Sequence, residues 1–234
     1  MTVGSVNLGF FNRIIIDDVM MYDQKGDSMI YASRISAKVS LLPLLNQKIS
    51  IASAQLFGLK ANLYQQTPQS KHNFQFVLDS LASKDTTKHT PLDLHIGSLI
   101  IRHGAVKYDK RYIASKSGVF SPAHISISDL STHIIANHIT DDAINLHIKK
   151  LAFRDKSGLQ LNSLSFKLDA DKREASLKEF ELQLPHSDIT LGDIHATYRF
   201  DNGKLVMPTL QYSGSIEQSK ITLSDIACLL PIFR

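Results

Sequence analysis

Apolar and polar residues alternate along much of this chain, but the alternation repeatedly skips one position. In INLHIKKLAFRD (residues 144–155), a first alternating arm is interrupted by Lys149 and Lys150. Leu151 and Phe153 then resume the alternation one position out of phase. Alternation is typical of a half-buried β-strand, because successive side chains point to opposite faces of a sheet. The skip therefore needs a structural explanation if both arms belong to one strand.

The same pattern recurs along the sequence: two apolar residues separated by one residue, a gap of two residues, and two further apolar residues separated by one residue. The gap residues are mostly polar, small or turn-forming, for example Asp17-Asp18 and Pro208-Thr209. Copies of the pattern begin at Ile14, Ile49, Leu94, Leu146, Leu159, Ile189 and Leu205, and a partial copy begins at Ile125.

Two explanations fit the gap. A two-residue hairpin turn favours such residues, but it would leave very short arms on either side. A β-bulge or bend inserts one residue into a longer strand, so that both arms keep their apolar side chains on one face while the strand curves. We favour the bend and expect a mixture, with Asn162-Ser163 and Gly192-Asp193 as the best candidates for turns.

A larger repeat is also visible between residues 19–39 and residues 151–168. In both segments an alternating arm leads to an Asp, then to a turn closed by Gly, then to a returning strand. Asp bonds to nearby backbone N–H groups and Gly accepts positive φ, so both segments are predicted to be hairpins. The predicted hairpin tips are Asp23 with Gly26 and Asp155 with Gly158.

Helical patterns are scarce. In HNFQFVLDSLAS, Phe74, Val77, Leu78 and Leu81 lie at helical spacing, with Asn73 as a candidate N-cap. Short apolar turns or helices are also expected in SLLPLLNQ (residues 40–47) and in LSDIACLLPIF near the end, with Ser224 or Asp225 as N-cap and Pro231 as the stop.

These patterns predict a mainly β protein: an elongated, curved, repeated antiparallel β-sheet, forming an open groove or a taco-like shape, with one or two short helices. Along the chain we expect an N-terminal β repeat unit with short helices (1–82), a linker or mobile loop (83–91), and further β repeat units with a short C-terminal helix (92–234). The alternative is a closed β-sandwich or barrel, in which the apolar faces form an ordinary core.

Composition excludes a disordered chain, because 43% of the 234 residues are hydrophobic and 21% are charged. The formal net charge of +4 is spread without a Lys/Arg tract, so a nucleic-acid partner is not expected. Cys228 is the only cysteine, which rules out an intrachain disulfide. No signal peptide or spanning apolar run is found, and we expect a fragment of a longer protein whose targeting segment is absent.

Motifs for catalysis and cofactor binding are absent from the sequence. The ten histidines show no zinc-type spacing, so no metal site is predicted. Adjacent carboxylates at Asp17-Asp18 and Asp141-Asp142 are expected in turns or bulges rather than as a catalytic pair. Cys228 sits in an apolar tail and is expected to be a buried structural thiol. We therefore predict no enzyme, no catalytic residue and no cofactor.

An apolar groove could hold acyl chains without any directional chemistry, because burying each methylene contributes about 0.8 kcal/mol. The predicted partner is then the acyl chain of a phospholipid. The candidate groove residues are Val19, Met21, Leu56, Leu99, Ile101, Leu151, Phe153, Leu164, Phe166, Phe180 and Leu182.

Four segments carry a resemblance to a known family: DDVMMYDQKGD, YASRISAKVSLLPLL, KISIASAQLFGLKANL and the helix start NFQF. With SPAHISISDLS and LAFRDKSGLQLNSLSFKL, they resemble the membrane-proximal region of AsmA/TamB-type envelope proteins, especially the TamB-like (DUF490-related) translocation and assembly proteins. The resemblance covers most of the chain.

This resemblance implies a periplasmic β-rich body folded as a groove and anchored in the inner membrane by a segment absent from this chain. It also implies a role in outer-membrane biogenesis, through phospholipid transport between membranes or through assembly of outer-membrane proteins with a protein partner. The alternative is a structural or protein-interaction β domain with a closed dry core and no lipid cargo.

Overall fold

The computed structural model describes residues 1–40, 51–82, 97–139, 143–201 and 204–229. Several sequence-based expectations lie outside these residues: the linker at 83–91, most of the apolar turn at 40–47, Asp141-Asp142, Pro231, and the first apolar residues of the copies that begin at Ile49 and Leu94.

Strands dominate the described residues, and the helices are short. The strands are β1 (Ser5–Gly9), β2 (Arg13–Tyr22), β3 (Ser28–Val39), β4 (Ile51–Phe57), β5 (Lys60–Gln65), β6 (Ser98–Lys110), β7 (His124–Ile139), β8 (Ala143–Asp155), β9 (Gln160–Asp171), β10 (Glu174–Gln183), β11 (Asp188–Leu191), β12 (Ile194–Thr197), β13 (Phe200–Asp201), β14 (Lys204–Leu205) and β15 (Gln211–Ser213). The helices are α2 (Gln75–Ala82), the 3₁₀ helix η1 (Met207–Thr209) and α3 (Leu223–Ile226).

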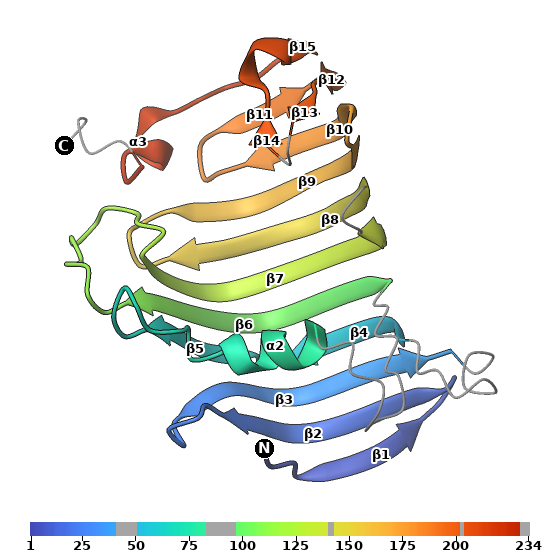
Figure 1. The fold of residues 1–234 in the computed structure, drawn as a ribbon, viewed down its shortest axis with the longest axis vertical. Helices are drawn as coiled ribbons and strands as arrows, with labels where there is room; N and C mark the ends of the chain where they lie inside the picture. Colours follow the sequence, from blue (N-terminus) through green and yellow to red (C-terminus); the bar gives the residue numbers. More distant parts are fainter. Residues whose placement is uncertain (41–50, 83–96, 140–142, 202–203, 230–234) are drawn as a thin grey trace.

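Thirteen strands form one sheet, in which the main path runs β1-β2-β3-β4-β6-β7-β8-β9-β10-β12-β15. β5 pairs with β3 and β6, β11 pairs with β10, and β13 and β14 form a separate two-stranded sheet. Figure 1 shows the strands stacked along the long axis, with the N-terminus at one end and the C-terminus near the other. The prediction of a mainly β protein with one curved sheet and short helices is confirmed.

The prediction of a wholly antiparallel sheet needs one correction, because the sheet is mixed. β4 and β5 both run parallel to β6, while the other pairings are antiparallel. A parallel pair requires a long crossover between the two strands. The residues between β5 and β6 contain α2, so the segment predicted to be helical belongs to this crossover.

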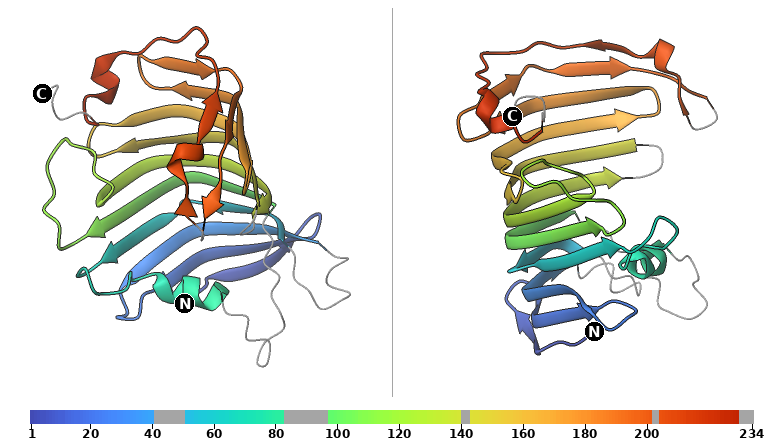
Figure 2. Two further views of the ribbon diagram at one scale, coloured as in Figure 1. Left: turned by 45° about the horizontal axis from the view of Figure 1, so that its top comes forward. Right: turned by 90° about the vertical axis from the view of Figure 1, so that its left-hand side faces the viewer.

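The strands arch, and the sheet is a single layer. In both views of Figure 2, α2 and the β13–β14 hairpin lie on the concave side of the arch. The chain exposes 15510 Å², whereas a compact monomer of 26.1 kDa would expose roughly 10,500 Å². A closed sandwich is therefore not what this sequence forms in the described residues.

The skip in the opening stretch is a bulge within one strand. The pairing of β8 with β9 shifts between Ile148 and Leu151, so β8 continues through Lys149 and Lys150 with one extra residue. Other strands carry equivalent irregularities near the bend. The pairing shifts in β7 between Ser128 and Ser131, in β6 between Ile101 and Gly104, and in β10 between Lys178 and Glu181. At these shifts His103, Asp129 and Glu179 have φ of 53–54°, and Asp18 in β2 has φ of 53° at the corresponding gap.

Two rows of directly opposed residues show that the bulge keeps both arms on one face. In β6 the rows contain Leu99 and Ile101, two positions apart and so on the same face. In β8 the same rows contain Ile148 and Leu151, three positions apart. The first row is Leu8, Ile14, Ala37, Ala54, Leu99, Ile134, Ile148 and Phe166; the second is Val6, Ile16, Ile35, Leu56, Ile101, Thr132, Leu151, Leu164, Leu182 and Ile189.

The turn interpretation is wrong at both of its best candidates. Asn162-Ser163 lies inside β9, where the pairing with β8 absorbs one extra residue. Gly192-Asp193 separates β11 from β12, and both strands pair antiparallel with β10, so the chain continues in one direction. Pro208-Thr209 is neither turn nor bulge, because it lies in η1 between strands of different sheets.

Both predicted helix caps are also wrong. Asn73 instead clamps β5, since its Oδ1 accepts a bond from Tyr64 N (2.9 Å) and its Nδ2 donates to Asn62 O (3.0 Å). Thr222 is the N-cap residue of α3, and Asp225 lies inside that helix with its side chain buried. There the Asp225 carboxylate accepts bonds from the backbone N–H of His186 and the hydroxyl of Ser187, which ties α3 to the turn before β11.

Both hairpin tips form as predicted. Asp23 Oδ1 accepts bonds from the N–H groups of Lys25 and Asp27, and Gly26 has φ +87°. Asp155 Oδ1 accepts a bond from Ser157 N, and Gly158 has φ +98°.

Deleting Lys150 should invert the second arm of β8. A one-residue slip sends side chains to the opposite face, so Leu151 and Phe153 would leave the concave side. We expect a loss of about 3 kcal/mol or more, seen as a fall in melting temperature of roughly 6–12 °C. The double substitution Lys149→Ser with Lys150→Ser keeps the residue count and should melt within about 3 °C of the wild type. Equal melting of the deletion and the double substitution would contradict a phase-setting bulge.

The buried carboxylate of Asp23 should make stability depend on Tyr64. Tyr64 donates its hydroxyl to Asp23 Oδ2 at 2.8 Å. Burial opposes ionisation of Asp23, but the bonds from Tyr64, Lys25 and Asp27 outweigh it and lower its pKa. This stabilisation is complete above the unfolded pKa of about 3.9 and is lost as the pH falls through the lower folded value.

We expect Tyr64→Phe to cost about 1–3 kcal/mol at pH 7, measured by denaturant unfolding, because it removes a donor from a buried carboxylate. The cost should shrink below about pH 4. The control is Tyr22→Phe, next to Asp23 in the β2–β3 hairpin. Tyr22 is 39% exposed, so a negligible change in stability is expected. A cost that stays constant down to pH 3 would refute the role of the ionised carboxylate.

Candidate functional site

The apolar rows line the concave side of the sheet. α2 lies over that side (Figure 2), and the ring of His72, three residues before α2, stands 5.8 Å from the ring of Tyr108. Tyr108 lies in the second arm of β6, opposite Leu63 and Ile125 in the neighbouring strands. These contacts place the apolar face inside the arch.

All eleven residues predicted to line a groove lie on this concave face, and they come from β2, β4, β6, β8, β9 and β10. Val19 is 5% exposed, and the other ten are half-buried. Half-burial is what a single layer produces, because each side chain touches its neighbours in the sheet but has no facing layer. The structure thus brings these residues together on one continuous surface, and their role as binding residues stays a prediction.

Sequence reasoning missed the contribution of β3 and the first half of the pattern in β10. Ile30, Ala32, Ile35 and Ala37 fit the skipped alternation in β3, and Ala175, Leu177, Phe180 and Leu182 fit it in β10. The signal was therefore present in the sequence. It was inconspicuous because alanine, a weakly hydrophobic residue, occupies some of the apolar positions.

The floor of the concave face varies in depth. Near β3 and β4 the first row is built from Ala37 and Ala54, which leave the backbone close to the surface. Near β9 and β10 the same face carries Phe166 and Phe180, whose rings stack at a centroid distance of 6.4 Å. Ten strand spacings of about 4.8 Å make this floor about 50 Å long.

The two rows that form the floor of the concave face contain a single polar side chain, and it has a hydrogen-bond partner. Thr132, the one polar residue of the two rows, donates its hydroxyl to the backbone oxygen of Lys150 at 3.1 Å. Such a surface offers area and no directional bond. It can therefore hold flexible apolar chains but cannot orient a reacting group.

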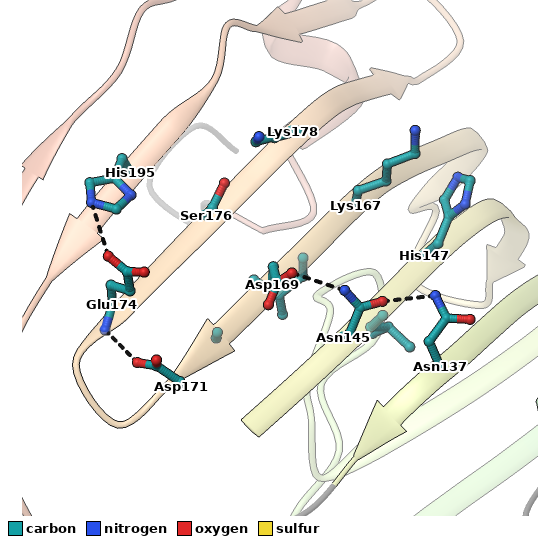
Figure 3. Close-up of a pocket in the computed structure, with 13 residues that line it drawn as sticks. Asn137, Asn145, His147, Lys167, Asp169, Asp171, Glu174, Ser176, Lys178 and His195 are labelled. Carbon is teal, nitrogen blue, oxygen red and sulfur yellow. Dashed lines mark hydrogen bonds and ion pairs between the residues drawn. The ribbon is translucent and has the colours of Figure 1, made fainter. Parts of the chain in front are cut away.

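The convex side is polar, because each bulge sends both gap residues to it. Figure 3 shows a pocket of about 650 Å³ on this side, over β8, β9, β10 and β12. Asn137 bonds to Asn145 (2.8 Å), Asn145 bonds to Asp169 (2.9 Å), and His195 lies 3.7 Å from Glu174.

The acids of this pocket have structural partners, so the arrangement does not resemble a catalytic site. Asp171 accepts bonds from the N–H groups of Arg173 and Glu174, which lower the pKa of Asp171. Burial lowers the pKa of His147, and Lys167 and Lys149 lower it further. In the described part of the chain no group of three or more His, Cys, Asp or Glu residues could hold a metal ion.

No protein-family model matches this chain, and no curated protein or solved structure matches it either. Within the described residues, no helix is both long and apolar enough to cross a membrane.

Truncating a floor residue should cost less here than in a closed core. Phe166→Ala should destabilise by about 1.5–2.5 kcal/mol, roughly half of the 3–5 kcal/mol typical of an enclosed phenylalanine, because the ring has neighbours on one side only. Equilibrium unfolding in urea measures this, with Phe166→Leu as the milder control. A cost of 4 kcal/mol or more would mean that the ring is enclosed.

Proposed function

We propose that this chain is part of a non-enzymatic, periplasmic AsmA/TamB-like protein whose concave apolar face holds phospholipid acyl chains. In the full-length protein an inner-membrane anchor outside this chain would fix one end. The groove would then serve outer-membrane biogenesis, either by passing phospholipid between membranes or by assisting the assembly of outer-membrane proteins with a protein partner.

One observation carries the proposal: two apolar rows cross the sheet on the concave side of a single open layer. An exposed apolar surface of this extent is unfavourable in water and marks a place where another apolar surface binds. Ten methylenes withdrawn from water would contribute about 8 kcal/mol before the entropy lost on binding is subtracted.

The segments that carry the family resemblance build this surface. DDVMMYDQKGD covers the second arm of β2 and the turn before β3, and LAFRDKSGLQLNSLSFKL spans the β8–β9 hairpin. Both supply candidate groove residues, Val19 and Met21 in the first and Phe153 and Phe166 in the second. The resemblance and the geometry therefore support the proposal through the same residues.

A second candidate function is recruitment of a protein by strand addition. β1 and β15 are the outermost strands of the main path, so each has one edge that pairs with no other strand in the described part of the chain. Large apolar side chains lie beside these edges: Leu8 is 88% exposed, Phe10 is 89% exposed and Tyr212 is 79% exposed. These edges favour binding of a protein partner at either end of the sheet. The closed dry core expected for a protein-interaction domain is not part of this second candidate.

Site-specific photo-crosslinking separates the two candidates. A benzophenone amino acid placed at Leu164, on the concave face, should crosslink to phospholipid when the chain is produced in the periplasm of a Gram-negative host. The same group at the neighbouring Ser165, which points to the convex side, should not. Mass spectrometry of the purified adduct identifies the lipid.

Native mass spectrometry of the unmodified chain, followed by lipid extraction, gives an independent check. Phe166→Asp should remove the lipid while the chain stays folded by circular dichroism, because the carboxylate makes the floor unfavourable for acyl chains. A benzophenone amino acid at Leu8 tests the strand edge in the same way. If neither method finds lipid and the probe at Leu8 crosslinks to a protein, recruitment by strand addition is favoured over lipid binding in the groove.

A further inference from the structure

A second pocket on the convex side gathers positive charge where β6, β7 and β8 bend. It has a volume of about 640 Å³. The bulges of β6 and β8 each send two consecutive side chains toward it, Arg102-His103 and Lys149-Lys150. His133 of β7 lies between them and is the cross-strand partner of Lys150.

The described residues supply no ionic partner for the three permanent cations of this pocket. Among the described residues no carboxylate forms an ion pair with Arg102, Lys149 or Lys150. Asp129 is the one acid that lines the pocket, and its carboxylate lies 3.5 Å from Arg154. Arg102 on β6 and the two lysines on β8 flank β7, so their charges repel one another across two strand spacings and a bound anion would relieve this repulsion.

Burial is the largest influence on the pKa of His133, and nearby positive charge adds to it. Burial lowers the pKa of His133, and the charge of Lys149 and the ring of His147 lower it further. A bound anion would raise the pKa of His133, because it stabilises the charged imidazolium.

We propose that this pocket binds the phosphate group of an anionic ligand. Arg102, Lys149 and Lys150 would supply charge-assisted hydrogen bonds, and the hydroxyl of Ser131 would supply a neutral one. Side chains from three strands line the pocket and offer several donors to the oxygens of a tetrahedral phosphate. The Arg102 guanidinium lies 5.9 Å from the Phe57 ring of β4 and would turn from that ring toward the ligand. The site lies on the opposite face from the concave groove and does not depend on what the groove holds.

Titration calorimetry with inorganic pyrophosphate tests the site. The full chain should bind it saturably at one site, with a dissociation constant below about 1 mM at low salt. Lys149→Gln combined with Lys150→Gln should weaken binding at least tenfold. The control is Lys25→Gln combined with Lys220→Gln, which removes the same charge from two distant exposed positions and should change binding less than twofold.

Nuclear magnetic resonance of the histidine rings adds a readout specific to this pocket. The apparent pKa of His133 should rise when pyrophosphate is added, and it should stay unchanged in the Lys149/Lys150 variant. The groups that face His133 from its neighbours are Arg102 and His103 in β6 and His147, Lys149 and Lys150 in β8.

Vesicle sedimentation identifies the source of the phosphate. Binding to phosphatidylcholine vesicles that contain phosphatidic acid, lost in the Lys149/Lys150 variant, would assign the site to a lipid headgroup. Pyrophosphate binding without vesicle binding would assign it to a soluble phosphate compound. The proposal is overturned if neither probe binds saturably, or if the control variant weakens binding as much as the pocket variant does.

Discussion

The strands of the large sheet must bend without turning their apolar side chains outward, and the rest of the structure depends on how they do so. A regular strand cannot bend sharply and stay in register, because its side chains alternate strictly between faces. A bulge adds one residue at the bend and restores the phase beyond it. In β8 the added residue falls at Lys149-Lys150, and the register across β7, β8 and β9 shows apolar side chains on one face at both ends.

The bulges give the two faces different chemistry. On the concave side the apolar rows continue across the bend, so the surface is long, apolar and covered by no second layer in the described residues. On the convex side each bulge supplies two consecutive polar residues, so polar and charged groups are denser at the bend than elsewhere. The concave face therefore offers apolar area, while the convex bend concentrates the positive charges of Arg102, Lys149 and Lys150, which have no ion-pair partner among the described residues.

Single-layer architecture also explains how the chain is stabilised. Few apolar residues are fully buried, and among them Met29 and Ala32 lie in β3, which is flanked by β2 on one side and by β4 and β5 on the other. Two buried side-chain hydrogen bonds add stability near strand ends: Tyr64 to Asp23 at the β2–β3 hairpin, and Ser187 to Asp225 at the last helix. These contacts hold loops and helices against strand ends, where the sheet alone offers little area for packing.

The sequence by itself determined the strands, the bends and the hairpin tips, because side-chain alternation and the preferences of Asp and Gly are local properties. It also determined which residues share a face, once the gap of two residues was interpreted as a bulge. Only the tertiary structure decided that β4 and β5 run parallel to β6, and that the chain keeps its direction through Gly192-Asp193. It also decided that the Asn73 side chain bonds to the backbone of β5. Each of these depends on a partner distant in sequence. The concave side was likewise decided by the sheet as a whole, because its curvature arises from many strands bending at neighbouring positions.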